Sequence, residues 1–328
     1  MKLGIIGSGG IVKNFLPFLA QMEGLELKAM LSTPRSLEDA KLTGAQFGIE
    51  NVTSDFETFC AYDIDTVYVA VPNFMHYDYC KKALERKLNV IVEKTMVSNI
   101  EEALSLKQIA EENRCFLFEA ITTLYLGNYQ KIREWLPRIG TVKIAQSQYS
   151  QYSSRYNAFR AGEVLPAFDP AKAGGALMDL NLYNIHYIMG LFGKPESCQY
   201  FPNIERNIDT SGTLILQYDG FIAVCTAAKD SKGMRGGLIQ GTDGIIRSEA
   251  SPNLVGKVTL ELNDGTVEEY DDGFTDKRMI PEFEAFIKAI NTDDYAFCME
   301  MLDRSIAVTK VQTEARKNAG IFFTADEK

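Results

Sequence analysis

The sequence predicts an α/β Rossmann domain with a doubly wound parallel sheet, followed by an α+β domain with a large, mostly antiparallel open sheet. Three observations support this. The chain has 328 residues, which suits two domains of roughly 150 residues each. Short apolar runs alternate with helical periodicity in the first part, as in right-handed βαβ crossovers. Strand and turn patterns dominate afterwards, so we expect domains at residues 1–120 and 121–328.

The strands expected in the first domain are short runs rich in Val, Ile and Leu, typical of a parallel sheet that is covered on both faces. They cover residues 2–6, 25–31, 66–71, 89–92 and 115–118. Helices are expected between them. Two of these helices have the side-chain spacing of an N-terminal capping box, Ser36 with Asp39 and Ser98 with Glu101.

The second domain is predicted to begin with a helix over 126–136 and a strand over 141–149. From residue 210 onward the pattern is that of a strand meander, because three Asp-Gly pairs each separate apolar or alternating runs. These pairs occupy positions 219–220, 243–244 and 264–265.

Two helices are predicted to close the chain. The first has Pro281 in its first turn, where proline is tolerated. Its apolar stripe consists of Phe283, Phe286, Ile287 and Ile290. The second covers 295–318 and is stopped by Gly320.

Composition and charge exclude several classes of protein. Hydrophobic residues make up 46% and charged residues 24%, an ordinary globular balance. Lys and Arg number 34 against 44 acids, a net charge of −10 that repels phosphate backbones, so we expect no nucleic-acid partner. No apolar stretch approaches about 18 residues, so we expect no membrane span.

The cysteines and histidines indicate the compartment and the kind of site. The glycine-rich N-terminus is followed at once by Lys13 and Asn14, which does not fit a signal peptide. The 6 cysteines contain no C-x-x-C pair and are expected to be reduced thiols of a cytoplasmic protein. With 2 histidines, we expect no histidine-rich metal site.

A glycine-rich turn follows the first predicted strand and opens the first helix. Its residues are Gly7, Ser8, Gly9, Gly10 and Ile11. Glycines there permit a tight turn and let backbone N–H groups approach a pyrophosphate at the positive end of the helix. Val12 replaces the third glycine or alanine of the usual pattern. A purely structural turn therefore remains the alternative to dinucleotide binding.

The end of the second strand indicates which dinucleotide binds. An acid at this place would bind the ribose hydroxyls of NAD, but the segment contains Ser32, Thr33 and Arg35, with no acid before Glu38. Two hydroxyls and a forked guanidinium suit the 2′-phosphate of NADP. We therefore predict NADP, with NAD as the alternative if Arg35 is only a solvated loop cation.

Two more strand ends carry polar residues where ligands bind in such sheets. Pro72 and Asn73 close one strand and His76 follows. His76 is either a cofactor contact or a residue in the first turn of a helix. Glu93 and Lys94 close the next strand. A lysine that leaves a buried strand at this edge is expected to point toward the cofactor, and the alternative is a stem that snorkels to solvent.

A second constellation lies on a predicted helix that follows Gly174 and Gly175. Asp179 and Tyr183 are four positions apart, so we expect them on one face of this helix, about 6 Å apart along the axis. An intrahelical hydrogen bond is the alternative. His186 continues the stripe too far up the axis, and we expect it to be packed and structural.

In this order, Gly7-Ser8-Gly9, Pro72-Asn73, Glu93-Lys94 and the Gly-Gly-Ala-Leu-x-Asp-x-x-x-Tyr segment resemble the glucose-fructose oxidoreductase / inositol dehydrogenase (Gfo/Idh/MocA) family. The resemblance covers essentially the whole chain. It implies hydride transfer between NAD(P) and a carbohydrate-like alcohol or ketone, and a C-terminal sheet used for oligomerisation. We therefore expect a homodimer or homotetramer.

The resemblance also implies roles for single residues. Lys94 corresponds to the active-site lysine of the family, and Tyr183 to its Asp-x-x-x-His/Tyr partner, on the glucose-fructose oxidoreductase and dihydrodiol dehydrogenase side. Three residues depart from the pattern. Thr95 replaces a proline, Asn181 replaces a glycine and is expected to protrude into the substrate pocket, and Leu124 stands where tyrosine-type members often carry arginine.

The expected mechanism assigns the proton to Tyr183. Tyrosine and lysine side chains both have a pKa near about 10, so either needs a pKa about three units lower to act near pH 7. A positive Lys94 favours tyrosinate, and an acid beside it favours a positive Lys94. We predict that Tyr183 exchanges the proton, Lys94 stabilises the substrate oxygen and Asp179 orients the pair. Proton exchange by Lys94 itself is the alternative.

The small-molecule substrate is not predicted by the sequence. Arg155, Tyr156 and Arg160, in a polar stretch, are candidates to meet a sugar or a carboxylate, unless they form a solvated loop. Two other functions remain as alternatives. An NADP-binding redox-sensing protein with little or no turnover would explain the three departures. A methyltransferase would require an acidic residue at the end of the second strand to bind the ribose of its cofactor, and the sequence has none there.

Overall fold

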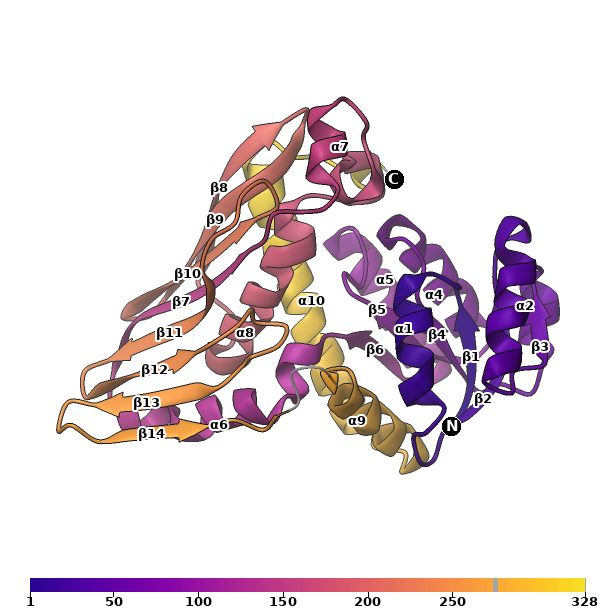
Figure 1. Cartoon of the computed structure of the whole chain (residues 1–328), viewed down its shortest axis with the longest axis horizontal. Coiled ribbons are helices and arrows are strands. Elements are labelled where there is room, and N and C mark those ends of the chain that lie inside the picture. Colours follow the sequence, from indigo (N-terminus) through magenta and orange to yellow (C-terminus); the bar gives the residue numbers. More distant parts are fainter. Residues whose placement is uncertain (274–276, 328) are drawn as a thin grey trace. The chain divides into compact units, whose positions relative to one another are not determined.

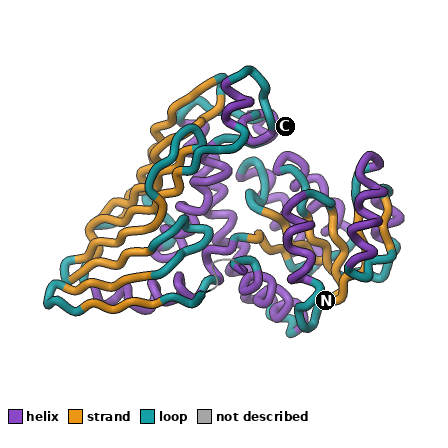
Figure 2. Tube along the Cα trace, viewed as in Figure 1, coloured by secondary structure: helices purple, strands orange, loops and turns teal. Residues whose placement is uncertain are grey.

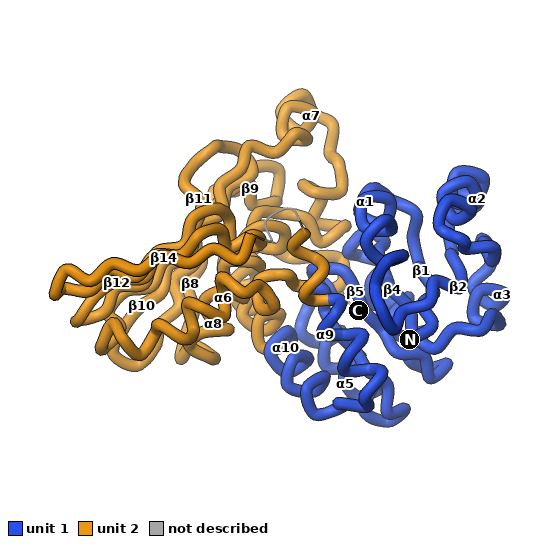
Figure 3. Tube along the Cα trace, turned by 60° about the horizontal axis from the view of Figure 1, so that its bottom comes forward, with its two compact units in different colours: residues 1–120, 283–306 blue, residues 121–282, 307–328 orange. Residues whose placement is uncertain are grey.

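The structure is a computed structural model and describes residues 1–273 and 277–327. The chain divides into two compact units, drawn in different colours in Figure 3. Unit 1 contains Met1–Ala120 and Phe283–Ile306, and unit 2 contains Ile121–Glu282 and Ala307–Lys328.

Unit 1 is built on a parallel sheet with the strand order β3-β2-β1-β4-β5-β6 (Figure 1). This order reverses direction between β1 and β4, where doubly wound sheets bind ligands at the carboxyl ends of the strands. The strands are β1 (Lys2–Ile6), β2 (Glu26–Leu31), β3 (Asn51–Thr53), β4 (Thr66–Val69), β5 (Asn89–Glu93) and β6 (Leu117–Ala120). The predicted fold class is confirmed for this part.

The helices of unit 1 alternate with these strands, as right-handed crossovers require. They are α1 (Gly10–Leu19), α2 (Leu37–Gln46), α3 (Phe56–Cys60), α4 (His76–Glu85) and α5 (Ile100–Asn113). The sequence analysis missed β3, because this strand is three residues long and has no buried position. A pattern so short and polar carries no period-2 signal.

Both predicted capping boxes are wrong in detail. Asn99, not Ser98, caps α5: its Oδ1 accepts from the backbone N–H of Glu102 at 2.8 Å, and the Glu102 carboxylate accepts from Ser98 N at 2.9 Å. The capping residues of α5 are therefore Asn99 and Glu102, one position after the predicted pair. Ser36 makes no cap bond, because its hydroxyl pairs with that of Thr33 at 2.6 Å.

The C-terminal helices are α9 (Ile280–Asn291) and α10 (Tyr295–Asn318). Residues 283–306 pack in unit 1, whereas the predicted second domain over 121–328 includes them. The apolar stripe of α9 explains the difference. The ring of Phe283 lies 4.8 Å from that of Phe15, and the ring of Phe286 stacks 4.6 Å from that of Phe118. The predicted apolar stripe of α9 is present, but the periodicity of a sequence does not indicate which surface such a stripe packs against.

Unit 2 contains a second sheet with the order β14-β13-β12-β11-β7-β10-β9-β8, seen as a fan of strands in Figure 2. Neighbours are antiparallel except for β7 and β10, which are parallel. The strands are β7 (Val142–Ser150), β8 (Ser197–Glu205), β9 (Ile208–Tyr218), β10 (Phe221–Ala228), β11 (Arg235–Gly241), β12 (Gly244–Ser248), β13 (Val258–Leu262) and β14 (Val267–Tyr270).

The three predicted Asp-Gly hairpins join β9 to β10, β11 to β12 and β13 to β14. The sequence analysis missed β8, which pairs with β9 through a turn at Arg206 and Asn207, both in the left-handed region (φ 50° and 64°). Short helices complete the unit: α6 (Gly127–Trp135), α7 (Tyr156–Arg160) and α8 (Leu182–Phe192). A mostly antiparallel open sheet is thus confirmed.

Candidate functional site

The glycine-rich turn lies at the carboxyl end of β1. Its glycines are required for different physical reasons. Gly7 has φ +117°, and a Cβ there would lie 2.4 Å from the Ala70 carbonyl oxygen, so the fold itself requires glycine. A Cβ at Gly9 or Gly10 would meet nothing within 4 Å. Packing therefore does not explain the second and third glycines, whereas close approach of a phosphate to the backbone does.

The first turn of α1 begins at Gly10 and contains no acidic residue. Its N–H groups are the unsatisfied donors of a helix start, which attract anions. Ser8 and Ile11 are partly exposed and flank the turn, whereas Val12 is buried against the domain core. This arrangement fits a pyrophosphate and needs no positive side chain at the turn itself.

The predicted 2′-phosphate residues follow β2. Thr33 and Arg35 are exposed, and Ser32 is buried, with its hydroxyl donating to the Thr33 carbonyl at 3.1 Å. The Thr33 hydroxyl pairs with Ser36. Asp39, in the same first turn of α2, forms an ion pair with Lys13 at 2.6 Å. The end of β2 therefore presents one guanidinium and one hydroxyl without an acid at the ribose position.

His76 does not face this edge, which contradicts one of its two interpretations. The imidazole is 0% exposed, with Nδ1 2.7 Å from the Thr95 carbonyl oxygen and Nε2 2.8 Å from the Val71 carbonyl oxygen. Burial lowers the pKa of His76. A direct cofactor contact is therefore wrong. The ring instead joins the segments that follow β4 and β5, which carry Pro72-Asn73 and Lys94.

The carboxylates of Glu93 and Glu119 accept hydrogen bonds from other residues of unit 1. Glu93 accepts a hydrogen bond from the Tyr68 hydroxyl. Glu119, which is 4% exposed, accepts from the backbone N–H of Met96 at 2.8 Å. Where the family pattern has proline, the Lys94–Thr95 peptide bond is cis. Pro72 is exposed and Asn73 is partly exposed at the neighbouring strand end.

The second constellation begins with a π-helical turn, Leu177–Asn181, that continues into α8. The predicted regular α-helical spacing is therefore wrong, because a π turn closes between residues i and i+5. Within 174–189, a segment that the structure describes throughout, the positions that are not buried are Asp179, Leu180 and Tyr183. Both predicted catalytic residues thus lie at the open side of an otherwise buried segment, and His186 is buried as expected.

Asn181 does not protrude into a pocket, so that prediction is wrong. It is 0% exposed, and its amide donates to the Cys225 carbonyl of β10 at 3.2 Å and accepts from Asn184 at 2.7 Å. Asn184 in turn accepts from the Ser147 hydroxyl of β7 at 2.9 Å. The two amides anchor the helix on the sheet, which explains why glycine is not needed there.

Two charged residues that the sequence analysis missed lie beside Asp179. The Lys229 ammonium is 2.9 Å from Asp179 Oδ2, and the side chain is 2% exposed. Asp209 is buried at the start of the π turn and accepts from the Leu177 N–H at 2.6 Å. Lys229 follows the apolar end of β10 just as Lys94 follows β5, so the signal used for Lys94 would have found it. Asp209 carries no such signal.

Of the three candidates for substrate contact, two are exposed. Arg155 and Arg160 lie at the ends of α7 with exposed side chains. Tyr156 is 8% exposed, and its hydroxyl donates to Glu205 at 2.7 Å. Its ring also packs among those of Phe159 and Phe168. Tyr156 is therefore structural here, contrary to the prediction.

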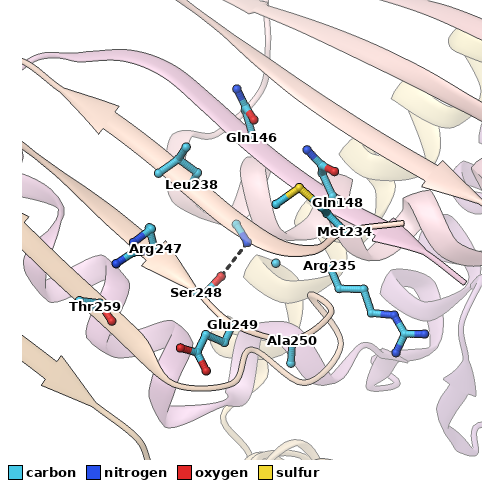
Figure 4. A pocket seen from close by; sticks show the side chains of 12 residues that line it. Gln146, Gln148, Met234, Arg235, Leu238, Arg247, Ser248, Glu249, Ala250 and Thr259 are labelled. Atoms are coloured by element: carbon cyan, nitrogen blue, oxygen red, sulfur yellow. Dashed lines mark hydrogen bonds between the residues drawn. The ribbon is translucent and has the colours of Figure 1, made fainter. Parts of the chain in front are cut away.

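A cavity of about 320 Å³ lies on the sheet of unit 2 (Figure 4). Its walls include Gln146 and Gln148 of β7 and Leu238 of β11. Successive strand residues point to opposite faces, and Ser147 contacts α8. The cavity therefore lies on the face away from α8 and is separate from Asp179 and Tyr183.

Metal-binding groups and membrane-spanning helices were searched for among the residues that the structure describes. In 1–273 and 277–327, no group of three or more His, Cys, Asp or Glu side chains could hold a metal ion. The helices over the same residues include none that is long and apolar enough to cross a membrane.

Comparisons with known proteins match both units. Residues 1–121 match the oxidoreductase family with an NAD-binding Rossmann fold, and residues 129–247 match the GFO/IDH/MocA C-terminal domain. The chain is 34% identical over 329 residues to the scyllo-inositol 2-dehydrogenase (NADP(+)) of Bacillus subtilis (strain 168), covering 100% of this chain and 99% of that protein.

Two further proteins are also similar to this chain over almost its whole length. An uncharacterised oxidoreductase of Escherichia coli (strain K12) is 30% identical over 328 residues, covering 99% of this chain and 98% of that protein. Among solved structures, a 3-ketoreductase from Actinomadura kijaniata in complex with TDP-benzene and NADP superposes with a TM-score of 0.81 at 21% identity, covering 96% of each chain. The last similarity shows the fold alone.

Proposed function

The chain belongs to the Gfo/Idh/MocA family of oxidoreductases, and from this premise we propose that it transfers a hydride between NADP and a polyol or carbohydrate-like alcohol or ketone. The observation that carries the proposal is the turn after β1. Gly9 and Gly10 leave open space at a helix start that contains no acid. A dinucleotide pyrophosphate is the ligand that such a turn fits.

NADP is favoured over NAD by the residues that follow β2. Thr33 and Arg35 are exposed beside α2, and a guanidinium offers the forked donors that bind a 2′-phosphate. Asp39, an acid of the first turn of α2, is engaged by Lys13. The relative from Bacillus subtilis is likewise named as an NADP(+) enzyme.

The proposed proton transfer uses the side chains of Tyr183 and Lys94, with Asp179 as the residue that orients them. When bound, the coenzyme supplies the hydride acceptor for the oxidation and the donor for the reduction. Tyr183 accepts the hydroxyl proton as the alcohol is oxidised and returns it in the reverse direction. Lys94 stabilises negative charge on the same oxygen. The partial exposure of Asp179 and Tyr183, on a segment that is otherwise buried, supports this assignment. Proton exchange by Lys94 is the alternative.

The substrate class is argued from the relatives and from α7. A scyllo-inositol dehydrogenase and a D-xylose dehydrogenase are among the similar proteins, so we propose a cyclic polyol or an aldose. Arg155 and Arg160 are exposed donors that suit several hydroxyls or a carboxylate.

We further propose a homodimer or homotetramer formed through the open face of the C-terminal sheet. The side chains of this face include Phe201 and Ile222, which are 52% and 42% exposed. Exposed apolar side chains on the sheet face that also carries Gln146 are what a second copy of the sheet would cover. Light scattering with size-exclusion chromatography measures the mass, and a monomer at micromolar concentration would contradict this.

The 6 cysteines are free thiols, which supports a reducing compartment such as the cytoplasm.

One experiment tests the central proposal. NADPH and NADH are titrated by fluorescence. Scyllo-inositol, myo-inositol, D-xylose, D-glucose and dihydrodiols are then offered as substrates with the oxidised form of the tighter-binding coenzyme, and formation of the reduced coenzyme is followed by absorbance. We expect tighter NADPH binding and turnover of a polyol or an aldose. Saturable NADPH binding without turnover on this panel would favour the redox-sensing alternative, and no binding of either coenzyme would contradict both.

A further inference from the structure

Lys229 is a buried cation with a complete set of partners. Its ammonium lies 2.9 Å from Asp179 Oδ2 and donates to the Ala167 carbonyl at 2.6 Å. It also lies 4.7 Å from the centre of the Phe168 ring. A charge that is 2% exposed is stable in a protein only when such partners surround it. Removal of Lys229 would therefore take away one charged contact that positions the Asp179 carboxylate.

Asp209 binds the beginning of the π turn, whereas Lys229 binds Asp179, two residues further along the same turn. Its Oδ2 accepts from the Leu177 N–H at 2.6 Å and from the Tyr200 hydroxyl at 2.7 Å. The first N–H groups of a helix have no partner within the helix, and a carboxylate there satisfies one of them. Asp209 therefore fixes the point where the π turn begins, two residues before Asp179.

Gly175 makes room for this carboxylate. It has φ +106°, and a Cβ at this position would lie 2.1 Å from Asp209 Oδ1. The Gly175 carbonyl also accepts from the Asp179 N–H at 3.2 Å. The glycine thus lets the strand carboxylate approach the helix start closely.

Both charges come from one pair of strands. Asp209 lies in β9, and Lys229 directly follows β10, the antiparallel neighbour of β9. The Lys229 N–H donates to the carbonyl of Thr210, the residue that follows Asp209, at 2.8 Å. A cation and an anion at the same end of two neighbouring strands therefore contact the two ends of residues 177–179.

We propose that Lys229 and Asp209 are positioning residues of the active site: together they fix the π-helical turn so that Asp179 and Tyr183 present their side chains to the substrate. This inference rests on the proposed function. Neither residue has the exposure to touch a substrate, so both act through the turn. The side chain of Asp179, by contrast, is 32% exposed.

The test compares Lys229→Met, Asp179→Asn, the double variant and Asp209→Asn with the control Lys232→Met, an exposed lysine three residues further on. With NADP⁺ and the best substrate of the panel above, we expect kcat of Lys229→Met to fall about tenfold to a hundredfold, since small displacements of reacting groups have effects of this size. NADPH affinity should stay within about twofold, because the glycine turn is in unit 1.

The double variant distinguishes a positioning role from an independent one. If Lys229 acts through Asp179, kcat of the double variant is no lower than that of the weaker single variant. Losses that multiply would overturn the proposal, as would a wild-type kcat for Lys229→Met. The double variant removes both charges of the ion pair, and Asp209→Asn conserves the shape of the side chain, so these two variants remain informative if Lys229→Met does not fold.

Hydrogen exchange of the free protein gives a readout that needs no substrate. Amides of 177–183 should exchange at least about tenfold faster in Lys229→Met and in Asp209→Asn than in wild type or Lys232→Met. Unchanged exchange would overturn the proposal. If the wild type turns over no substrate, the proposed function fails, and the exchange result still decides whether these residues position the turn.

Discussion

The two glycine-rich turns of this protein look alike in sequence and differ in what their glycines do. At Gly9 and Gly10 a Cβ would meet open space, whereas at Gly174 and Gly175 it would lie 2.6 Å from the Pro166 carbonyl oxygen and 2.1 Å from Asp209 Oδ1. Both turns open a helix. The first turn has open space, which the proposed function assigns to the coenzyme, and the second is filled by the protein's own carboxylate. A glycine pattern alone does not distinguish these cases, but the space around each Cβ does.

The largest effect should come from filling the second turn. Gly175→Ala imposes a left-handed φ on a residue with a Cβ and forces it against Asp209, so we expect the free energy of unfolding to fall by about 4 kcal/mol. Urea unfolding followed by fluorescence of Trp135, the 1 tryptophan of the sequence, reports on unit 2. A loss below about 1 kcal/mol would show that the turn adapts, and the contrast between the turns would fail.

The second effect concerns pH. Burial raises the pKa of Asp209 to about 6, although the hydrogen bond from Leu177, that from Tyr200 and the charge of Lys229 lower it. The folded state therefore holds this proton more tightly than the unfolded state, whose pKa is near about 4. Stability should fall as pH rises from about 4 to 6, by about 3 kcal/mol in total.

The difference between wild type and Asp209→Asn isolates this contribution, because all other carboxylates are common to both proteins. Urea unfolding at several pH values should show the wild type losing stability relative to the variant across this window. A difference that is constant from pH 4 to 7, or that rises with pH, would contradict a raised pKa for Asp209.

In the first turn we expect a change in binding rather than in stability. Gly9 has φ −76° and an open Cβ direction, so Gly9→Ala should change the free energy of unfolding by less than about 0.5 kcal/mol. The added methyl group would occupy the path of the pyrophosphate, and the Kd for NADPH should rise about tenfold, or about 1.4 kcal/mol. Unchanged affinity would mean that this turn is only structural.

The smallest expected effect separates the two coenzymes. Arg35→Ala should weaken NADPH about fivefold, since an exposed charge-assisted contact contributes about 1 kcal/mol, and should leave NADH unchanged. Fluorescence titration of both coenzymes measures this, with Lys41→Ala, an exposed lysine of the following helix α2, as the matched control. Equal losses for NADPH and NADH would place Arg35 outside the 2′-phosphate site.

Local signals predicted the parts of the site that depend on local structure. The glycine turn, the strand-end residues and Tyr183 lie on the elements that the sequence predicts, whereas Asp179 lies in a π turn where a regular α-helix was predicted. His76 and Asn181 were misassigned, because their environments come from Thr95 and from β10, contacts that no periodicity reports.

The contacts of Lys229 and Asp209 with the π turn could not be predicted for the same reason, although the position of Lys229 directly after an apolar strand is a signal in the sequence. Their partners, Asp179 and Leu177, lie on a different element, and the pairing depends on how the sheet and the helix pack. The assignment of α9 to unit 1 likewise depended on aromatic packing against Phe15 and Phe118. Sequence patterns predicted which faces are apolar, and tertiary packing decided which surfaces those faces cover.

The most direct measurement is the pH dependence of kcat for Tyr183→Phe and for Lys94→Met, compared with wild type on one substrate. A residue that exchanges the proton contributes at least about a hundredfold to the rate. We predict that Tyr183→Phe loses this factor together with the wild-type pH profile, whereas Lys94→Met keeps a tyrosine ionisation shifted to higher pH. A Tyr183→Phe variant with a near-normal kcat would contradict the account and assign the proton to Lys94.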